Sequence, residues 1–205
     1  MKNVDSDMIW FVHQVVNQPF IRSDLDGNLK HPKMNYWRIP IVPYQVGAPA
    51  GSIMLLRSDY REQDGGKSLF TLEEALNIND RLIDRFGLGL ITVKQWINVY
   101  NYVATFFDYD SQMIANNLHM RFLSKEDAYW TASYSIKCNS GRLEGGSTFV
   151  LNKNIQGLKI VERHPSSKLP IRLCVADELR FNEVLSQEGL PYLQDSDDAR
   201  IVLPF

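Results

Sequence analysis

The stretch TLEEALNINDRLIDRFGLGLITVKQW, residues 71–96, decides the fold class of this 205-residue chain, because it contains two marked helix starts. Each start is a capping box, in which a Thr hydroxyl accepts from the third following backbone N–H and an acid or amide at that position reaches back. Thr71 and Glu74 form the first box, and Thr92 and Gln95 form the second. The sequence therefore predicts two successive helices.

The positions between the two starts predict where the first helix ends. Apolar residues recur near the helical period up to Phe86, and Gly87 suits the left-handed position that follows a helix. We expect a short buried connector over residues 88–91. The second helix then carries an apolar face that includes Trp96.

Elsewhere the pattern changes to that of strands. Residues 31–70 hold four prolines, which predicts edge strand and irregular loop. From residue 128 onwards polar and apolar residues alternate, with expected turns at 139–141 and 145–146. A strand before two helices and several antiparallel strands after them make an α+β layout. Further short helices are expected over 7–16 and 177–187, and strands over 52–57, 129–137, 147–151, 158–162 and 170–175.

Composition excludes several classes of protein. The formal net charge is −2, with 22 basic and 24 acidic residues and no long run of like charge, so a nucleic-acid footprint is not expected. No apolar run approaches the roughly 20 residues that span a bilayer. The apolar stretch Met8–Val16 is short and lacks a preceding basic region, so we expect neither a cleaved signal nor a membrane anchor. Cys138 and Cys174 predict two reduced thiols and no disulfide framework.

Three motifs, in order and at suitable spacing, give the chain a family resemblance over about half its length. Thr92–Trp96 resembles the second-helix start of bacterial C-type-lectin-like domains, Tyr129–Ser133 resembles their Tyr-Trp-Ser-Ser-Ser segment, and Pro170–Val175 is similar to their terminal strand. Such domains occur in the paralogous surface proteins of gut Bacteroidetes, in formylglycine-generating enzymes and in related phage virion proteins. Two departures are Gly89–Ile91, where Arg-Leu-Pro is usual, and Thr131-Ala132 in place of two serines.

The resemblance implies a domain with two arms. We expect an N-terminal arm over 1–30, a C-type-lectin-like domain of two helices and an antiparallel sheet over 31–177, and a C-terminal arm over 178–205. Trp96 and Trp130 are expected to pack in the same core rather than to stack on a ligand.

The sequence contains no recognisable catalytic or metal-binding motif. The calcium loop and the Trp-Asn-Asp strand of sugar-binding lectins are absent, and the region of Asp108, Asp110 and Asn116 is expected to be a solvated loop. The close cysteine pair of formylglycine-generating enzymes is also absent. We expect no catalytic residue, no cofactor and no metal ion, although a Ser–His–Asp site assembled from distant residues stays open.

Three functions from different classes remain. The first is a non-enzymatic component of a bacteriophage virion that binds other protein subunits, as a homo-oligomer or a multi-protein particle, without nucleic acid or membrane insertion. Its expected contact is an apolar segment after an acidic one, unless that segment packs on its own domain: Ile201, Val202, Leu203, Pro204 and Phe205. The second is an adhesin or receptor-binding module at the cell surface, which would use loops 139–146 and 108–117. The third is a cytoplasmic enzyme.

Overall fold

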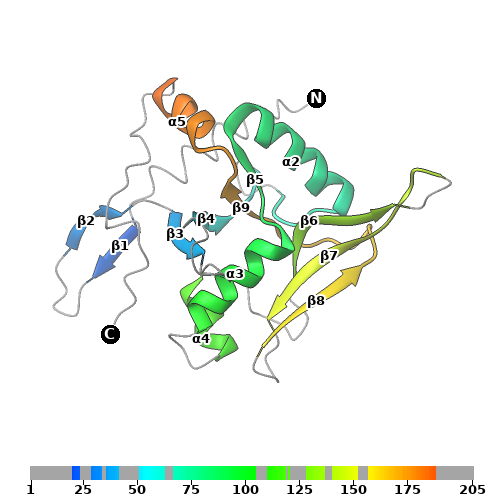
Figure 1. Ribbon diagram of the computed structural model, residues 1–205, viewed down its shortest axis with the longest axis horizontal. Coiled ribbons are helices and arrows are strands. Elements are labelled where there is room, and N and C mark those ends of the chain that lie inside the picture. Colours follow the sequence, from blue (N-terminus) through cyan, green and yellow to red (C-terminus); the bar gives the residue numbers. More distant parts are fainter. Residues whose placement is uncertain are drawn as a thin grey trace.

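The computed structural model describes residues 20–23, 29–33, 36–41, 51–62, 67–104, 110–118, 120, 128–136, 140–151 and 157–187. Over these residues the protein is α+β, as the sequence predicts, with helices packed against antiparallel sheets (Figure 1). The elements are β1 (Phe20–Ser23), β2 (Leu29–Lys33), β3 (Tyr36–Ile41), β4 (Gly51–Asp59), α2 (Leu72–Phe86), β5 (Leu88–Leu90), α3 (Val93–Ala104), α4 (Ser111–Asn117), β6 (Ala128–Ile136), β7 (Leu143–Leu151), β8 (Leu158–Arg163), β9 (Arg172–Val175) and α5 (Glu178–Gln187).

A four-stranded sheet with strand order β3-β4-β9-β5 lies between two layers of helices (Figure 1). Its strands pair antiparallel, and β9 lies between β4 and β5 although it follows both in sequence. Strand β4 contributes side chains to both faces of this sheet, because successive side chains of a strand point to opposite sides. Met54 and Leu56 pack in the cluster with α2 and α5, whereas Ile53 and Leu55 pack in the cluster with α3 and α4.

A second sheet, of strand order β6-β7-β8, projects from the body of the molecule (Figure 1). It is joined to the rest through the beginning of β6. The backbone N–H of Trp130 donates to the Pro170 carbonyl at 3.1 Å, and that of Ala132 donates to the Ile91 carbonyl at 3.2 Å. Strands β1 and β2 form a separate two-stranded pair.

Both predicted helix starts are confirmed. The Thr71 N–H donates to Glu74 Oε2 at 2.8 Å, and the Thr92 N–H donates to Gln95 Oε1 at 2.8 Å. Glu74 also binds the Lys67 ammonium, and this hydrogen bond is the main reason that the pKa of Glu74 lies below its usual range. The predicted stop is confirmed as well, since Gly87 follows α2 with φ 65°.

Two glycine-containing segments differ from their expected structure. Residues 88–91 are buried between α2 and α3, as expected, but residues 88–90 also form strand β5, which pairs with β9 at the edge of the central sheet. Gly145 and Gly146 are not a turn but part of β7. A Cβ at Gly146 would lie 2.7 Å from side-chain atoms of both Leu72 and Trp130, so glycine here permits the close approach of α2.

A third expectation, of a solvated loop over residues 108–116, was wrong for the part that the structure describes. Residues 111–117 form helix α4, and the Asp110 carboxylate caps it by accepting from the Met113 N–H at 2.8 Å. The buried side chains of Ile114 and Ala115 then pack against α3 in the core. Asp110 is therefore a capping residue.

Trp96 and Trp130 are buried core residues, as predicted, but they lie on opposite faces of the central sheet instead of in one core. The Trp96 ring stacks on Phe149 with centroids 4.3 Å apart. Its indole N–H has no hydrogen-bond partner among the described residues, so packing holds the ring. The Trp130 indole N–H donates to the Phe70 carbonyl at 2.8 Å.

The two expected arms lie largely outside the described residues. Of the C-terminal arm, 178–205, the first part is helix α5, whose Phe181 and Val184 side chains are buried in the α2 cluster. The expected helix over 7–16, Cys138 and the apolar residues 201–205 all fall outside the description. No helix among the described residues is both long enough and apolar enough to cross a membrane.

Gly87 provides a test of the junction between α2 and α5. We expect Gly87→Ala to lower the free energy of unfolding by about 2 kcal/mol or more, because the left-handed conformation costs an L-residue about 1–2 kcal/mol and a Cβ would collide with the Asp177 carbonyl oxygen. Gly141→Ala is the matched control, since Gly141 has φ 62° but open space around it. Urea unfolding midpoints at unchanged slope measure both. Equal losses in the two variants would contradict the proposed collision.

Candidate functional site

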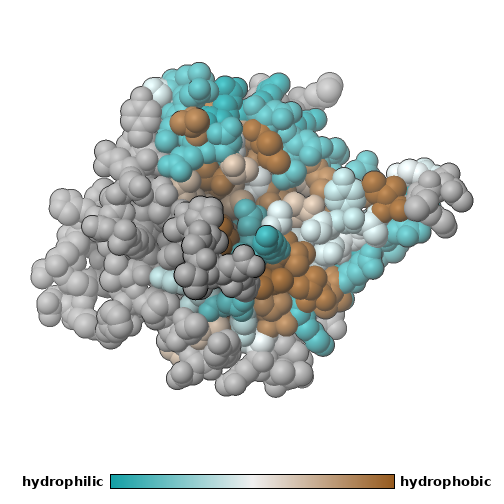
Figure 2. All heavy atoms as spheres, viewed as in Figure 1, coloured by the Kyte–Doolittle hydropathy of each residue, from teal (hydrophilic) through white to brown (hydrophobic). Residues whose placement is uncertain are grey.

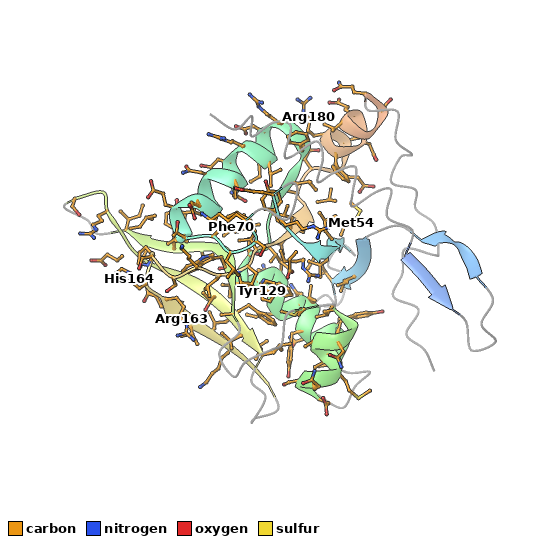
Figure 3. All side chains as sticks on the ribbon, turned by 180° about the vertical axis from the view of Figure 1, so that it is seen from behind. Met54, Phe70, Tyr129, Arg163, His164 and Arg180 are labelled. Carbon is orange, nitrogen blue, oxygen red and sulfur yellow. The ribbon has the colours of Figure 1, made fainter. Side chains whose placement is uncertain are left out.

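A groove of about 620 Å³ opens between the start of α2, the β6–β7 hairpin and the turn that follows β8. We call it the hairpin groove. Figure 3 labels Arg163 and His164 beside it, in the half of the three-stranded sheet from which the hairpin projects. The groove is lined by Thr71, Glu73, Arg142, Leu143, Glu144, His164, Pro165 and Ser166.

Backbone hydrogen bonds fix the walls of the hairpin groove. The Leu72 N–H at the start of α2 donates to the Pro165 carbonyl at 2.9 Å, which joins the helix to the turn after β8. The turn is closed by the Ser167 N–H, which donates to the His164 carbonyl at 2.9 Å. The hairpin wall follows from the β6–β7 pairing, in which Ile136 lies opposite Leu143. The groove is thus built by elements that the core already holds in place.

The charged side chains of the hairpin groove are open to a partner. Glu73, Arg142 and Glu144 are exposed, and within the described part of the chain none of their charged groups has a hydrogen-bond or ion-pair partner. Neighbouring Glu162 differs, because it accepts from the Ser135 hydroxyl at 2.6 Å. Two carboxylates and one guanidinium therefore face the groove without neutralising each other.

Two exposed apolar side chains border the hairpin groove on the hairpin side. Tyr134 is 49% exposed and Ile136 is 47% exposed. Residues opposite each other in an antiparallel pair share a face. Ile136 therefore shares the face of Leu143, which lines the groove. Figure 2 shows that hydrophobic residues also reach the surface elsewhere on this sheet.

The cross-strand row next to the groove contains a further cation. Tyr134 lies opposite Gly146, which lies opposite Arg163. Side-chain atoms of Leu72 and Trp130 occupy the space over Gly146 and so lie between the two side chains. The Nε of Arg163 is buried without a hydrogen-bond partner among the described residues.

His164 and Ser166 form a local turn. The Ser166 hydroxyl lies 2.8 Å from His164 Nδ1, and the Ser166 N–H donates to the same nitrogen at 3.3 Å. A nucleophile and base also lie at such a distance, but a triad needs a third group to orient the imidazole. In the described residues no carboxylate hydrogen-bonds to His164. The contacts present are those of a turn that shapes the groove.

The structure also locates the other residues considered from sequence. Among the described residues no three His, Cys, Asp or Glu side chains are grouped as metal ligands. Cys174 is a free thiol, as predicted, and burial raises its pKa to about 12. Of the two loops expected to bind a ligand, residues 142–144 line the groove, whereas residues 111–117 form α4.

The sequence indicated one wall of the hairpin groove, which falls in the expected ligand loop 139–146. The hairpin and the turn after β8 follow the start of α2 by about 70 and 90 residues, and no motif links these three parts of the chain. Tyr134 lies in a segment that the sequence predicts as an alternating strand and not as a binding surface. The alternation of β6 gave a signal for its exposure, because Ser133 and Ser135 flank it.

Comparison with known proteins gives no matching family model, no matching curated protein and no matching solved structure.

A second polar cluster, inside the protein, is structural. The buried Arg172 guanidinium donates from Nε to Asp59 Oδ1 at 2.8 Å, and its Nη1 donates to the carbonyls of Leu56 and Leu118 at 3.1 and 3.0 Å. The Tyr129 hydroxyl donates to Asp59 Oδ2 at 2.9 Å. These contacts join β4, β6, β9 and the end of α4.

Substitutions in this cluster separate the loss of one hydrogen bond from the loss of a carboxylate that a buried cation contacts. We expect Tyr129→Phe to lower the free energy of unfolding by about 1–2 kcal/mol and Asp59→Ala to lower it by about 3–5 kcal/mol, because the latter removes the carboxylate to which the buried Arg172 donates. Adding Arg172→Met to Asp59→Ala should recover part of the loss. Urea unfolding measures each variant, with the exposed Tyr134→Phe as control. An Asp59→Ala loss no larger than that of Tyr129→Phe would count against the account.

Proposed function

We propose that this protein is a non-enzymatic structural and interaction protein built on a C-type-lectin-like domain, and that it is a component of a bacteriophage virion. Its partners are other protein subunits, in a homo-oligomer or a multi-protein particle. The observation that carries the proposal is the surface of the hairpin groove. Exposed Tyr134 and Ile136 lie on the strand beside unpaired charges of both signs, and protein interfaces combine aromatic and apolar side chains with polar ones in this way.

The residues of the lectin-like resemblance support a scaffold role. Trp96, Trp130 and Arg172 are each fully buried and committed to packing or to internal hydrogen bonds. None of them is free to contact a ligand. Their part in the function is to hold the surface elements in place.

The proposed assembly contact is the apolar segment Ile201–Phe205, which follows the acidic residues 195–198. Five consecutive apolar or proline residues are costly to leave in water, and a neighbouring subunit would cover them. The segment lies outside the described residues, so its composition is the basis for this part of the proposal.

Analytical ultracentrifugation of the full chain tests the assembly. We expect the wild-type chain to sediment as an oligomer at micromolar concentration, and the double variant Leu203→Asp/Phe205→Asp to sediment as a monomer with an unchanged urea midpoint. Leu179→Asp is the matched control, because Leu179 is 80% exposed on α5. A monomeric wild-type chain, or an oligomer that survives the double substitution, would refute assembly through this segment.

The second candidate function is a glycan-binding module. Tyr134 favours it, because a half-exposed ring beside interspersed donors and acceptors can stack on a sugar while the polar groups bind its hydroxyls. Ile136 favours a protein partner instead, since a branched aliphatic side chain offers a sugar hydroxyl no hydrogen bond.

A glycan array decides on the second candidate. If the protein binds a glycan through the hairpin groove, the wild-type signal should fall at least about tenfold in Tyr134→Ala, since loss of a central aromatic contact costs more than 1.4 kcal/mol. Met113→Ala, which removes an exposed apolar side chain from α4, should retain the signal. A wild-type array without any bound glycan would exclude this function for the glycans tested.

A further inference from the structure

The hairpin groove and residues 195–205 have complementary chemistry. The segment reads Asp195-Ser-Asp-Asp-Ala-Arg200-Ile-Val-Leu-Pro-Phe205, which is an acidic part, one basic residue and an apolar part. The groove and the strand beside it offer a counterpart to each part: the cation Arg142, the carboxylates Glu73 and Glu144, and the apolar side chains of Tyr134, Ile136 and Leu143.

We propose that the hairpin groove of one copy of this chain receives residues 195–205 of a second copy. This inference rests on the proposed assembly function and names the surface that accepts the segment. Arg200 binds between the carboxylates of Glu73 and Glu144. The apolar residues 201–205 cover Tyr134, Ile136 and Leu143.

The charge of the groove selects a segment with a basic residue. The carboxylates of Glu73 and Glu144 lack partners in the described part of the chain, so a guanidinium between them gains charge-assisted hydrogen bonds without displacing existing ones. Arg200 is the one Lys or Arg in residues 188–205. A single cation in the segment therefore defines the register in which it binds.

The acidic residues of the segment have a partner at the same site. Arg142 is exposed and its guanidinium is unpaired among the described residues. Carboxylates of Asp195–Asp198 would supply acceptors to this guanidinium, which an ordinary apolar peptide would not.

The position of α5 places residues 195–205 away from the groove of their own chain. The groove lies at the Thr71 end of α2, whereas α5 starts against Gly87 at the other end, about 22 Å away for a helix of this length. Figure 1 shows α5 beyond that far end. The twelve residues 188–199 before Arg200 span at most about 43 Å, so docking within one chain would need these residues to run back along the length of α2. Docking between copies needs no such path, and it joins one subunit to the next, as the proposed assembly requires.

A charge swap in the full-length chain tests the inference. Glu144→Arg and Arg200→Glu should each weaken self-association at least about tenfold, because each places like charges in contact. The double variant Glu144→Arg/Arg200→Glu should associate at least about threefold more tightly than either single variant, because a new ion pair forms between positions 144 and 200 while the unchanged Glu73 keeps the recovery partial. Asp84→Arg/Arg200→Glu is the matched control, because exposed Asp84 lies near the far end of α2. Sedimentation equilibrium measures all four variants.

A labelled peptide of residues 195–205 gives a second readout. It should bind the wild-type chain and bind Glu144→Arg at least about tenfold more weakly. If the chain associates through residues 201–205 but the swap restores nothing, the groove assignment is overturned while the assembly function stands. Equal peptide binding to both chains, cross-links between segment and groove within a single chain only, or glycan binding that the peptide does not displace would also overturn it.

Discussion

The described fold depends on the buried guanidinium of Arg172. It donates to the Asp59 carboxylate and to two backbone carbonyls, and Asp59 in turn accepts from Tyr129. An unpaired charge at this depth would cost several kcal/mol, so β4, β6, β9 and the end of α4 have to meet at one point. The chain therefore closes through a contact between residues 113 positions apart.

The same closure positions the hairpin groove. Tyr129 faces the Arg172 cluster, so the alternation of β6 turns the next residue, Trp130, towards the α2 side. The Trp130 indole N–H then binds the Phe70 carbonyl just before α2 begins. Two residues on, the Leu72 N–H holds the turn at Pro165. The groove thus lies at the surface end of a series of core contacts, and these contacts hold its walls in place.

The features that depend only on neighbouring residues in the chain could be predicted from the sequence. The Thr71 and Thr92 boxes and the Gly87 stop depend on neighbours within a few residues, so the sequence determines them. Strand β5 and the glycines of β7 depend on distant partners. Leu88–Leu90 is a strand because β9 pairs with it. Gly146 is extended because it pairs with β6 and β8, and Leu72 of α2 and Trp130 leave no room for a side chain there. The groove could not be predicted for the same reason, since its chemistry arises only when the hairpin and the turn at His164 come together.

The exposure of the charged side chains in the groove indicates which kind of interaction they support. Catalysis benefits from charged groups held in a dry site, where their fields act strongly on a transition state. Glu73, Arg142 and Glu144 are exposed and unpaired in the described structure, so a partner must cover them before they act strongly. Charges that a partner buries contribute more to specificity and orientation than to affinity. A weak contact of this kind suits a particle in which many identical contacts form together, because multivalency multiplies their effect. This chemistry fits the proposed role of the groove in aligning subunits.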